Sequence, residues 1–242
     1  MYAIQARSLV KRYKNLTAVD GLDLEIPQGE LFSLLGVNGA GKTTAIKMLS
    51  CLTMPTKGDA TVGGYSICTE AARVKQLIGV SPQQTAVAPN LTVKENLELI
   101  CGIHGFSREK TQEKICELSR QLDLDTVLSR KAGKLSGGWQ RRVSIAMALI
   151  SQPRILFLDE PTLGLDVLAR HDLWAVIRAL KGSITIILTT HYMEEAEALS
   201  DRIGIMKNGR LLAVGTAQQL TELAGTENFE TAFVSIVKEE AP

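Results

Sequence analysis

The stretch that decides the fold is Leu31-Phe32-Ser33-Leu34-Leu35-Gly36-Val37-Asn38-Gly39-Ala40-Gly41-Lys42-Thr43-Thr44. Its first five residues are nearly all apolar, as expected of a parallel strand buried on both faces. The next eight match the pattern Gly-x-x-x-x-Gly-Lys-[Ser/Thr], and a helical run from Thr44 to Leu52 follows. A strand, this loop and a helix in that order are the context that a phosphate-binding loop requires.

Each residue type in this loop has a chemical reason. Glycines let successive backbone N–H groups turn inward around a phosphate chain, and the following helix points its positive end at it. Lys42 adds a mobile cation, and the Thr43 hydroxyl is a ligand for Mg²⁺. A glycine-rich turn with a surface lysine is the alternative, but it does not explain the flanking strand and helix. We therefore expect nucleotide to be held by Gly36, Asn38, Gly39, Ala40, Gly41, Lys42, Thr43 and Thr44.

Further strands lie outward from this loop along the chain. The segment 22–26 alternates apolar and charged residues, and 154–158, 183–188 and 202–206 are further apolar runs separated by helical patterns. One helix between them has a single apolar face, formed by Leu165, Leu168, Leu173, Val176, Ile177 and Leu180. Strands that alternate with helices predict an α/β fold with a mostly parallel sheet.

The middle of the chain differs, because residues 92–151 contain helical patterns and no strand-like run. We interpret them as a helical insertion in a single domain whose α/β core comprises residues 1–91 and 152–242. The closing residues 238–242 are expected to be frayed.

Composition excludes several classes of protein. The 242 residues are 45% hydrophobic, and 27 basic against 26 acidic residues give a net charge of +1, so no global field draws the chain to nucleic acid or to a bilayer. No run approaches the roughly 20 apolar residues of a membrane span, and no signal peptide is recognisable. The expected location is the cytosol, and Cys51, Cys68, Cys101 and Cys116 are interpreted as core thiols rather than disulfides.

A second chemical feature is the carboxylate pair Asp159-Glu160, which follows the buried run 154–158. Ligands of open α/β sheets bind at such carboxyl ends of strands. Asp159 is suited to hold a metal through its water shell, and Glu160 to orient or deprotonate an attacking water. The chain has no Asn-Lys-x-Asp guanine motif, which favours ATP over GTP.

The segment Leu135-Ser136-Gly137-Gly138-Trp139-Gln140-Arg141-Arg142, in front of a helical run, strongly resembles the signature of the ATP-binding-cassette (ABC) ATPases. That resemblance implies a P-loop NTPase (RecA-like) core with an N-terminal antiparallel β subdomain and a helical signature subdomain. It also implies that Ser136, Gly137 and Gly138 grip a γ-phosphate at a helix N-terminus. Trp139 stands where the family usually has glutamine, which affects only the finer geometry of this contact.

The remaining motifs follow in family order, and their roles come from the resemblance. Tyr13 matches the aromatic that stacks on adenine, although a strand-end tyrosine packed on the core is the alternative. Gln83 resembles the glutamine that touches Mg²⁺ and water, so the expected metal-binding residues are Thr43, Gln83 and Asp159. The loop 163–166 resembles the one that crosses the dimer interface. His191 resembles the histidine that hydrogen-bonds the γ-phosphate, which places it with Lys42, Gln83 and Glu160 in the catalytic set.

Three segments, 90–97, 192–197 and, more loosely, 228–233, look like the ATPase subunits of ABC-2 type drug, lipid or polysaccharide exporters. The resemblance implies a separate membrane-spanning permease as partner, a peripheral position at the cytoplasmic face of the membrane, and no nucleic acid. A soluble ABC ATPase that remodels nucleic acid or ribosomes is the alternative, and a regulator that never hydrolyses ATP would lack Glu160.

The mechanism implied is an ATP-sandwich dimer, formed with a second copy or a close paralogue. Each ATP lies between the phosphate loop of one subunit and the signature of the other. The membrane chain sets the transported substrate.

Overall fold

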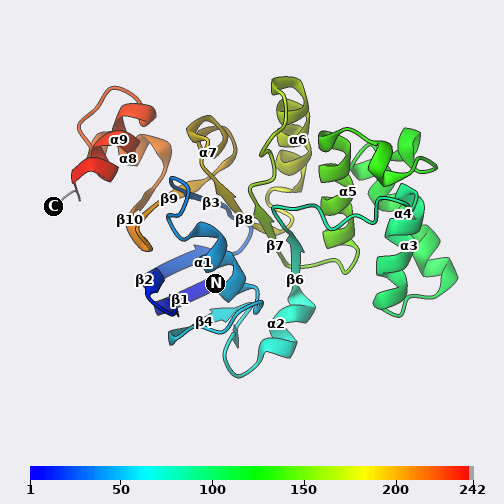
Figure 1. Cartoon of the computed structure of the whole chain (residues 1–242), viewed down its shortest axis with the longest axis horizontal. Coiled ribbons are helices and arrows are strands. Elements are labelled where there is room, and N and C mark those ends of the chain that lie inside the picture. Colours follow the sequence, from blue (N-terminus) through cyan, green and yellow to red (C-terminus); the bar gives the residue numbers. More distant parts are fainter. Residues whose placement is uncertain (240–242) are drawn as a thin grey trace.

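The computed structural model of the chain describes residues 1–239, which form two sheets surrounded by helices (Figure 1). The larger sheet has the strand order β10-β9-β3-β8-β7-β6 and the smaller one β2-β1-β4-β5. The larger sheet comprises β3 (Leu31–Leu35), β6 (Ile78–Ser81), β7 (Ile155–Asp159), β8 (Thr185–Thr190), β9 (Arg202–Lys207) and β10 (Arg210–Gly215). The smaller sheet comprises β1 (Tyr2–Tyr13), β2 (Leu16–Pro27), β4 (Lys57–Val62) and β5 (Tyr65–Ser66).

The large sheet is parallel except for its edge strand β10, and the small sheet is antiparallel. The register of the parallel strands positions the site. Leu35 of β3 pairs with Thr190 of β8, and Asp159 of β7 pairs with Thr189. The carboxyl ends of the three central strands therefore end side by side, and the loops that follow them meet at one edge of the sheet.

Helices and the small sheet cover the two faces of the large sheet. The helices are α1 (Lys42–Leu49), α2 (Ala71–Leu77), α3 (Val93–Ile103), α4 (Arg108–Gln121), α5 (Gly137–Leu149), α6 (Val167–Leu180), α7 (Met193–Leu199), α8 (Ala217–Leu223) and α9 (Phe229–Glu239). Alternate residues of the central strands enter different cores. Leu156 and Leu158 pack with the helices of the insertion and α6, whereas Ile155 and Phe157 pack with α1 and the small sheet. This burial on both faces explains the continuous apolar runs.

Between β6 and β7 the described chain forms helices, turns and one isolated β-bridge but no strand, and Figure 1 shows α3, α4 and α5 together at the right-hand side. Thr92 caps α3 in a capping box with Glu95, which explains why the helical pattern begins there. Ser107 caps α4 by accepting a hydrogen bond from the backbone N–H of Lys110.

The fold class predicted from the sequence is confirmed, with corrections to several details. A strand was expected at 183–188, but β8 begins at residue 185 and ends at residue 190, because a turn with Gly182 at φ +82° precedes it. Leu168 was expected on the buried face of α6 but is 79% exposed, since the first turn of that helix projects from the core. Cys116 is exposed rather than a core thiol. Residues 238–239 continue α9, contrary to the expected fraying, and 240–242 lie outside the described residues.

Sequence patterning missed β1, β4, β5, the short strand β6 and the edge strand β10, and the small sheet was expected only from the family resemblance. Among residues 1–239, no helix has both the length and the apolar character needed to span a bilayer.

Candidate functional site

The phosphate loop joins β3 to α1, and two of its glycines are required by close backbone contacts. A Cβ on Gly36 would lie 2.3 Å from the carbonyl oxygen of Met206, and one on Gly41 would lie 2.4 Å from that of Ala18. Gly41 also has φ +103°, a conformation that side chains other than hydrogen disfavour. The loop therefore packs directly against backbone, which leaves Val37, Asn38 and Gly39 exposed to a ligand.

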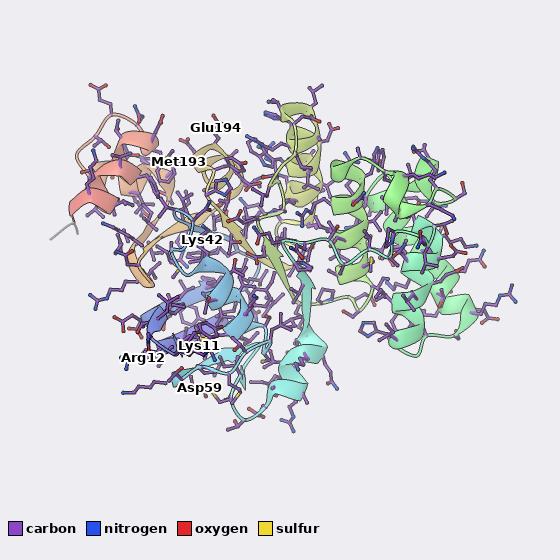
Figure 2. The ribbon with its side chains drawn as sticks, in the orientation of Figure 1. Lys11, Arg12, Lys42, Asp59, Met193 and Glu194 are labelled. Atoms are coloured by element: carbon purple, nitrogen blue, oxygen red, sulfur yellow. The ribbon has the colours of Figure 1, made fainter. Side chains whose placement is uncertain are left out.

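Lys42 is the first residue of α1, and Figure 2 shows it in the middle of the molecule, above the labelled Lys11 and Arg12. Its side chain is only 4% exposed. Nζ donates hydrogen bonds to the carbonyl oxygens of Gly36 at 2.7 Å and Val37 at 3.2 Å, and lies 3.5 Å from Oε1 of Glu160. Burial lowers the pKa of Lys42, and the Glu160 carboxylate opposes that shift. The ammonium is thus held inside the loop by its own carbonyl groups.

Asp159, at the end of β7, is bound by hydroxyl groups from two other elements. Oδ1 accepts hydrogen bonds from Thr43 Oγ1 of α1 at 3.0 Å and from Thr189 Oγ1 of β8 at 2.6 Å. A carboxylate beside a threonine hydroxyl is a set of hard oxygen donors, which Mg²⁺ prefers. Because Mg²⁺ keeps several waters and takes oxygens from substrate phosphates, this pair fits the metal that the sequence predicted.

Glu160 follows Asp159 in the chain, and its backbone is strained because φ is +47°, in the left-handed region. Its N–H donates to both the carbonyl oxygen of Thr189 at 3.1 Å and the Thr189 hydroxyl at 3.0 Å, which holds this conformation. The carboxylate is 8% exposed and lies between two cationic or polar groups, with Oε1 near Lys42 and Oε2 3.1 Å from His191 Nδ1. Left-handed non-glycine residues are uncommon and occur often at active sites.

His191 follows β8 and joins this cluster from the far side of Glu160. Its ring lies 4.0 Å, centroid to centroid, from that of Tyr192, and the guanidinium of Arg170 lies 4.5 Å from the centroid of the Tyr192 ring. The side chain of His191 is a quarter exposed, so one face of the ring can meet a ligand.

Gln83 lies in the loop after β6, and its side chain is exposed. The backbone of this loop is held by Arg141 of α5, which donates to the carbonyl oxygens of Pro82 and Gln83, both at 2.7 Å. The two predicted site elements, the Gln83 loop and the helix that begins at the signature, are therefore joined within one chain.

The signature residues begin α5, and Ser136 is its N-cap with an exposed side chain that makes no capping hydrogen bond. A Cβ on Gly137 would lie 3.2 Å from Leu165, and one on Gly138 would lie 3.2 Å from Ala169, so both glycines pack against the segment 165–169. Trp139 is partly buried in the helical core, and the Arg142 guanidinium lies 5.0 Å from its ring centroid. Tryptophan is thus accommodated by packing inside the insertion.

Tyr13 ends β1 and is 44% exposed, so it does not pack on the core, which was the alternative for this residue. The ammonium of Lys11 lies 5.1 Å from its ring centroid.

The structure brings together five of the predicted residues, namely Lys42, Thr43, Asp159, Glu160 and His191. Among residues 1–239, no hydrogen bond or ion pair joins Ser136, Gly137 or Gly138 to the phosphate loop. Figure 1 shows α5 with the insertion, apart from α1. Sequence reasoning missed Thr189 and Arg141. The available signal for Thr189 was its place at the end of a buried strand, two residues before His191.

The chain resembles proteins of known family in sequence and in structure. The family profile described as ABC transporter matches residues 19–163. The daunorubicin resistance ATP-binding protein DrrA2 of Streptomyces coeruleorubidus is 40% identical over 230 residues, which cover 95% of this chain and 71% of that protein. The linearmycin resistance ATP-binding protein LnrL of Bacillus subtilis (strain 168) is 38% identical over 237 residues, which cover 98% and 76%.

Solved structures give the same result. An ATP-binding subunit of an ABC transporter superposes with a TM-score of 0.84 at 28% identity and covers 97% of this chain and 99% of that one. A dimeric ATP-binding cassette in a post-hydrolysis state, bound to ADP and phosphate, superposes with a TM-score of 0.79 at 28% identity and covers 88% and 98%.

Proposed function

The chain belongs to the ABC transporter family and is an ATP-hydrolysing subunit that works as an ATP-sandwich dimer, and from this premise we propose that it drives an exporter of drug-like molecules. Its proposed partner is an ABC-2 type membrane-spanning permease, which would hold it at the cytoplasmic face of the membrane. The resistance proteins among its relatives support an export role. No feature of the site favours the soluble remodelling alternative.

The observation that carries the proposal is the incomplete site within one chain. The phosphate loop, Asp159, Glu160 and His191 meet at one edge of the sheet, whereas the exposed Ser136 lies on a separate helix. Phosphoryl transfer needs donors on several sides of the γ-phosphate. We propose that Ser136, Gly137 and Gly138 of a second copy or a close paralogue supply the missing side.

In the proposed site, the phosphates lie in the loop formed by Gly36, Asn38, Gly39, Ala40 and Gly41, with Lys42, Thr43 and Thr44 at the start of α1. The exposed ring of Tyr13 stacks on the adenine. Thr43, Asp159 and Gln83 would hold Mg²⁺ directly or through water, and the ion would supply positive charge to neutralise the phosphate oxygens.

Hydrolysis requires Glu160 to exchange its partners. Its two carboxylate oxygens face Lys42 and His191 in this structure. The γ-phosphate of a bound ATP attracts both of these groups, which frees one carboxylate oxygen to accept a proton from the attacking water. The water oxygen bonds to the γ-phosphorus as the bond to the β–γ bridging oxygen breaks and ADP leaves with that oxygen. The hydrogen bonds from the Glu160 N–H to Thr189 keep the backbone of Glu160 in place as the partners exchange. The insertion 92–151 is proposed to be the helical signature subdomain of a single ATPase domain, which presents Ser136 to the second copy.

The test is Glu160→Gln, which keeps the shape of the side chain but removes the base. We expect the ATP hydrolysis rate to fall at least about a hundredfold, because general bases contribute about 10² to 10⁴. ATP binding should persist, and an ATP-bound dimer should accumulate on size-exclusion chromatography with Mg²⁺.

Glu194→Gln is a matched control, because that exposed glutamate lies near His191 in sequence and, among residues 1–239, forms an ion pair with Arg170 alone. Hydrolysis at the wild-type rate by Glu160→Gln would remove Glu160 from the mechanism. The membrane part is tested by fractionation. The chain should sediment with membranes only when its permease is co-expressed, and binding to protein-free liposomes at physiological salt would contradict the proposal.

A further inference from the structure

Arg141 is a buried cation with an unusual set of partners. Its side chain lies on the second turn of α5 and the residue is 5% exposed. The two terminal nitrogens of its guanidinium donate to the carbonyl oxygens of consecutive residues, Pro82 and Gln83, both at 2.7 Å. One planar side chain therefore holds two successive peptide groups, which fixes the direction of the loop as well as its position.

The charge of Arg141 is not neutralised by an ion pair. Across residues 1–239, none of the carboxylates lies within ion-pair distance of its guanidinium. Burial lowers the pKa of Arg141, and Asp159, at longer range, partly opposes that effect. A buried cation without a counter-ion is costly unless its hydrogen bonds are satisfied. The two carbonyl groups are thus the partners that make this position tolerable for arginine.

Two more contacts fasten α5 to β6, the strand that leads into the Gln83 loop. Ser144, one turn beyond Arg141, has its hydroxyl 2.9 Å from that of Ser81, and both are buried. Gly79 lets the helix backbone approach closely, because a Cβ there would lie 2.3 Å from the carbonyl oxygen of Ala148. The later turns of α5 therefore pack directly on β6, whereas Arg141 holds the loop that follows this strand.

The far end of the same loop is also held from the insertion. Asn96 of α3 accepts a hydrogen bond from the backbone N–H of Ala88 at 2.7 Å and donates one to its carbonyl at 3.1 Å. Between these two anchors, Val87 packs against the helical core and the side chain of Gln83 is exposed. Arg141 is thus the contact that holds the backbone at Gln83.

We propose that Arg141 is a positioning residue that makes the Gln83 loop follow the signature helix of the same chain, and so links the two ATP sites of the dimer. The inference rests on the function proposed above. Gln83 serves the ATP of its own phosphate loop, whereas α5 begins at Ser136, which serves the ATP of the second copy. A movement of the signature at one ATP is thereby transmitted through one guanidinium to the Gln83 loop at the other.

Mixed dimers test this link. One chain carries Ser136→Arg and the other Lys42→Ala, so that a single site combines an intact Lys42 with an intact Ser136. Arg141→Met in the Ser136→Arg chain releases the Gln83 loop at the working site, and in the Lys42→Ala chain it releases the signature helix there. We expect either placement to lower the recovered hydrolysis rate about tenfold or more, since two hydrogen bonds to a charged group are lost. An unchanged hydrolysis rate for either placement of Arg141→Met would overturn the proposal.

ATP binding separates positioning from a general loss of structure. ATP affinity without Mg²⁺ should not change in Arg141→Met, because the phosphate loop is untouched, while the maximal rate falls. Arg141→Lys keeps the positive charge but not the planar guanidinium that binds two carbonyl groups at once. It should therefore restore part of the ATP hydrolysis rate. Ser144→Ala is the matched control on the same helix face, and we expect it to lower thermal stability without changing the ATP response of the mixed dimer.

A readout independent of activity covers the cases in which Arg141→Met folds poorly or the mixed parent chains recover no hydrolysis. Hydrogen exchange of the amides in 83–87, measured on nucleotide-free Arg141→Lys, should rise at least about threefold relative to α1, while Ser144→Ala leaves it unchanged. Unaltered exchange would refute the role of Arg141. Parent chains that recover no activity despite confirmed mixed dimers would instead show either that both sites must act together or that Ser136 does not serve the shared site, and the exchange result would still decide whether Arg141 holds the loop.

Discussion

The Thr189 hydroxyl offers a sharp test of how the site is held together. Thr189 is fully buried at the end of β8, and its hydroxyl donates to Asp159 at 2.6 Å while accepting from the Glu160 N–H at 3.0 Å. Thr189→Val replaces the hydroxyl with a methyl group of similar size, so no cavity forms. In this variant Asp159 keeps the hydrogen bond donated by the Thr43 hydroxyl, and the Glu160 N–H keeps its hydrogen bond to the carbonyl oxygen of residue 189.

The expected cost follows from these contacts. Loss of one hydrogen bond to a charged carboxylate is worth about 1.5 to 3 kcal/mol. At about 2 to 4 °C per kcal/mol for a domain of this size, the melting temperature should fall by about 3 to 12 °C. Because Asp159 is then oriented by one hydroxyl instead of two, the Mg²⁺ concentration for half-maximal hydrolysis should rise about tenfold, which corresponds to 1.4 kcal/mol.

Thr185→Val is the matched control, four residues earlier on the same face of β8. Thr185 is also buried, but its hydroxyl accepts from the neutral Gly29 N–H at 2.9 Å, far from Asp159 along the strand. It should lose about 0.5 to 1.5 kcal/mol of stability with no change in the Mg²⁺ requirement. If Thr189→Val behaves like this control in a Mg²⁺ titration of ATP hydrolysis, the hydroxyl is structural only and the reasoning about Asp159 is wrong.

Two further predictions concern the phosphate loop and a buried acid. Gly41→Ala should abolish ATP binding measured by calorimetry, because its Cβ would meet Ala18 at 2.4 Å, whereas Gly39→Ala, with open space around it, should weaken binding only through its φ of +82°. Equal losses in the two variants would contradict the steric argument. Burial raises the pKa of Glu195, whose Oε1 accepts from Trp174 Nε1 at 3.0 Å, so the folded state holds this proton to higher pH than the unfolded state. Its contribution to stability is therefore fully present below the unfolded pKa and is lost as pH rises through the folded pKa. Glu195→Gln should flatten the fall in melting temperature that begins as the pH rises above the ordinary glutamate pKa of about 4.3, and an unchanged profile would show that Glu195 does not cause it.

The sequence alone determined the features that depend on local order along the chain. A buried strand, a glycine-rich turn and a helix in succession identify the phosphate loop, since the turn requires glycine and the strand requires apolar residues on both faces. The position of Asp159 and Glu160 after a buried strand follows from the same pattern. The signature became interpretable only through its resemblance to a family, because as a local pattern it predicts only a capped helix.

Tertiary structure decided the contacts between residues far apart in sequence. The parallel register of β7 and β8 places Thr189 opposite Asp159, 30 positions earlier, and no periodicity in either strand encodes that register. Arg141 binds Pro82, which lies 59 positions earlier in the chain. The helical pattern of the sequence predicts only on which face of α5 Arg141 lies, and not this partner. Leu168 has the spacing of a core residue yet is exposed, since periodicity defines a helix face but not how far the neighbouring elements extend along it. Local chemistry therefore specified which groups are present, and the packing of strands and helices specified which of them meet.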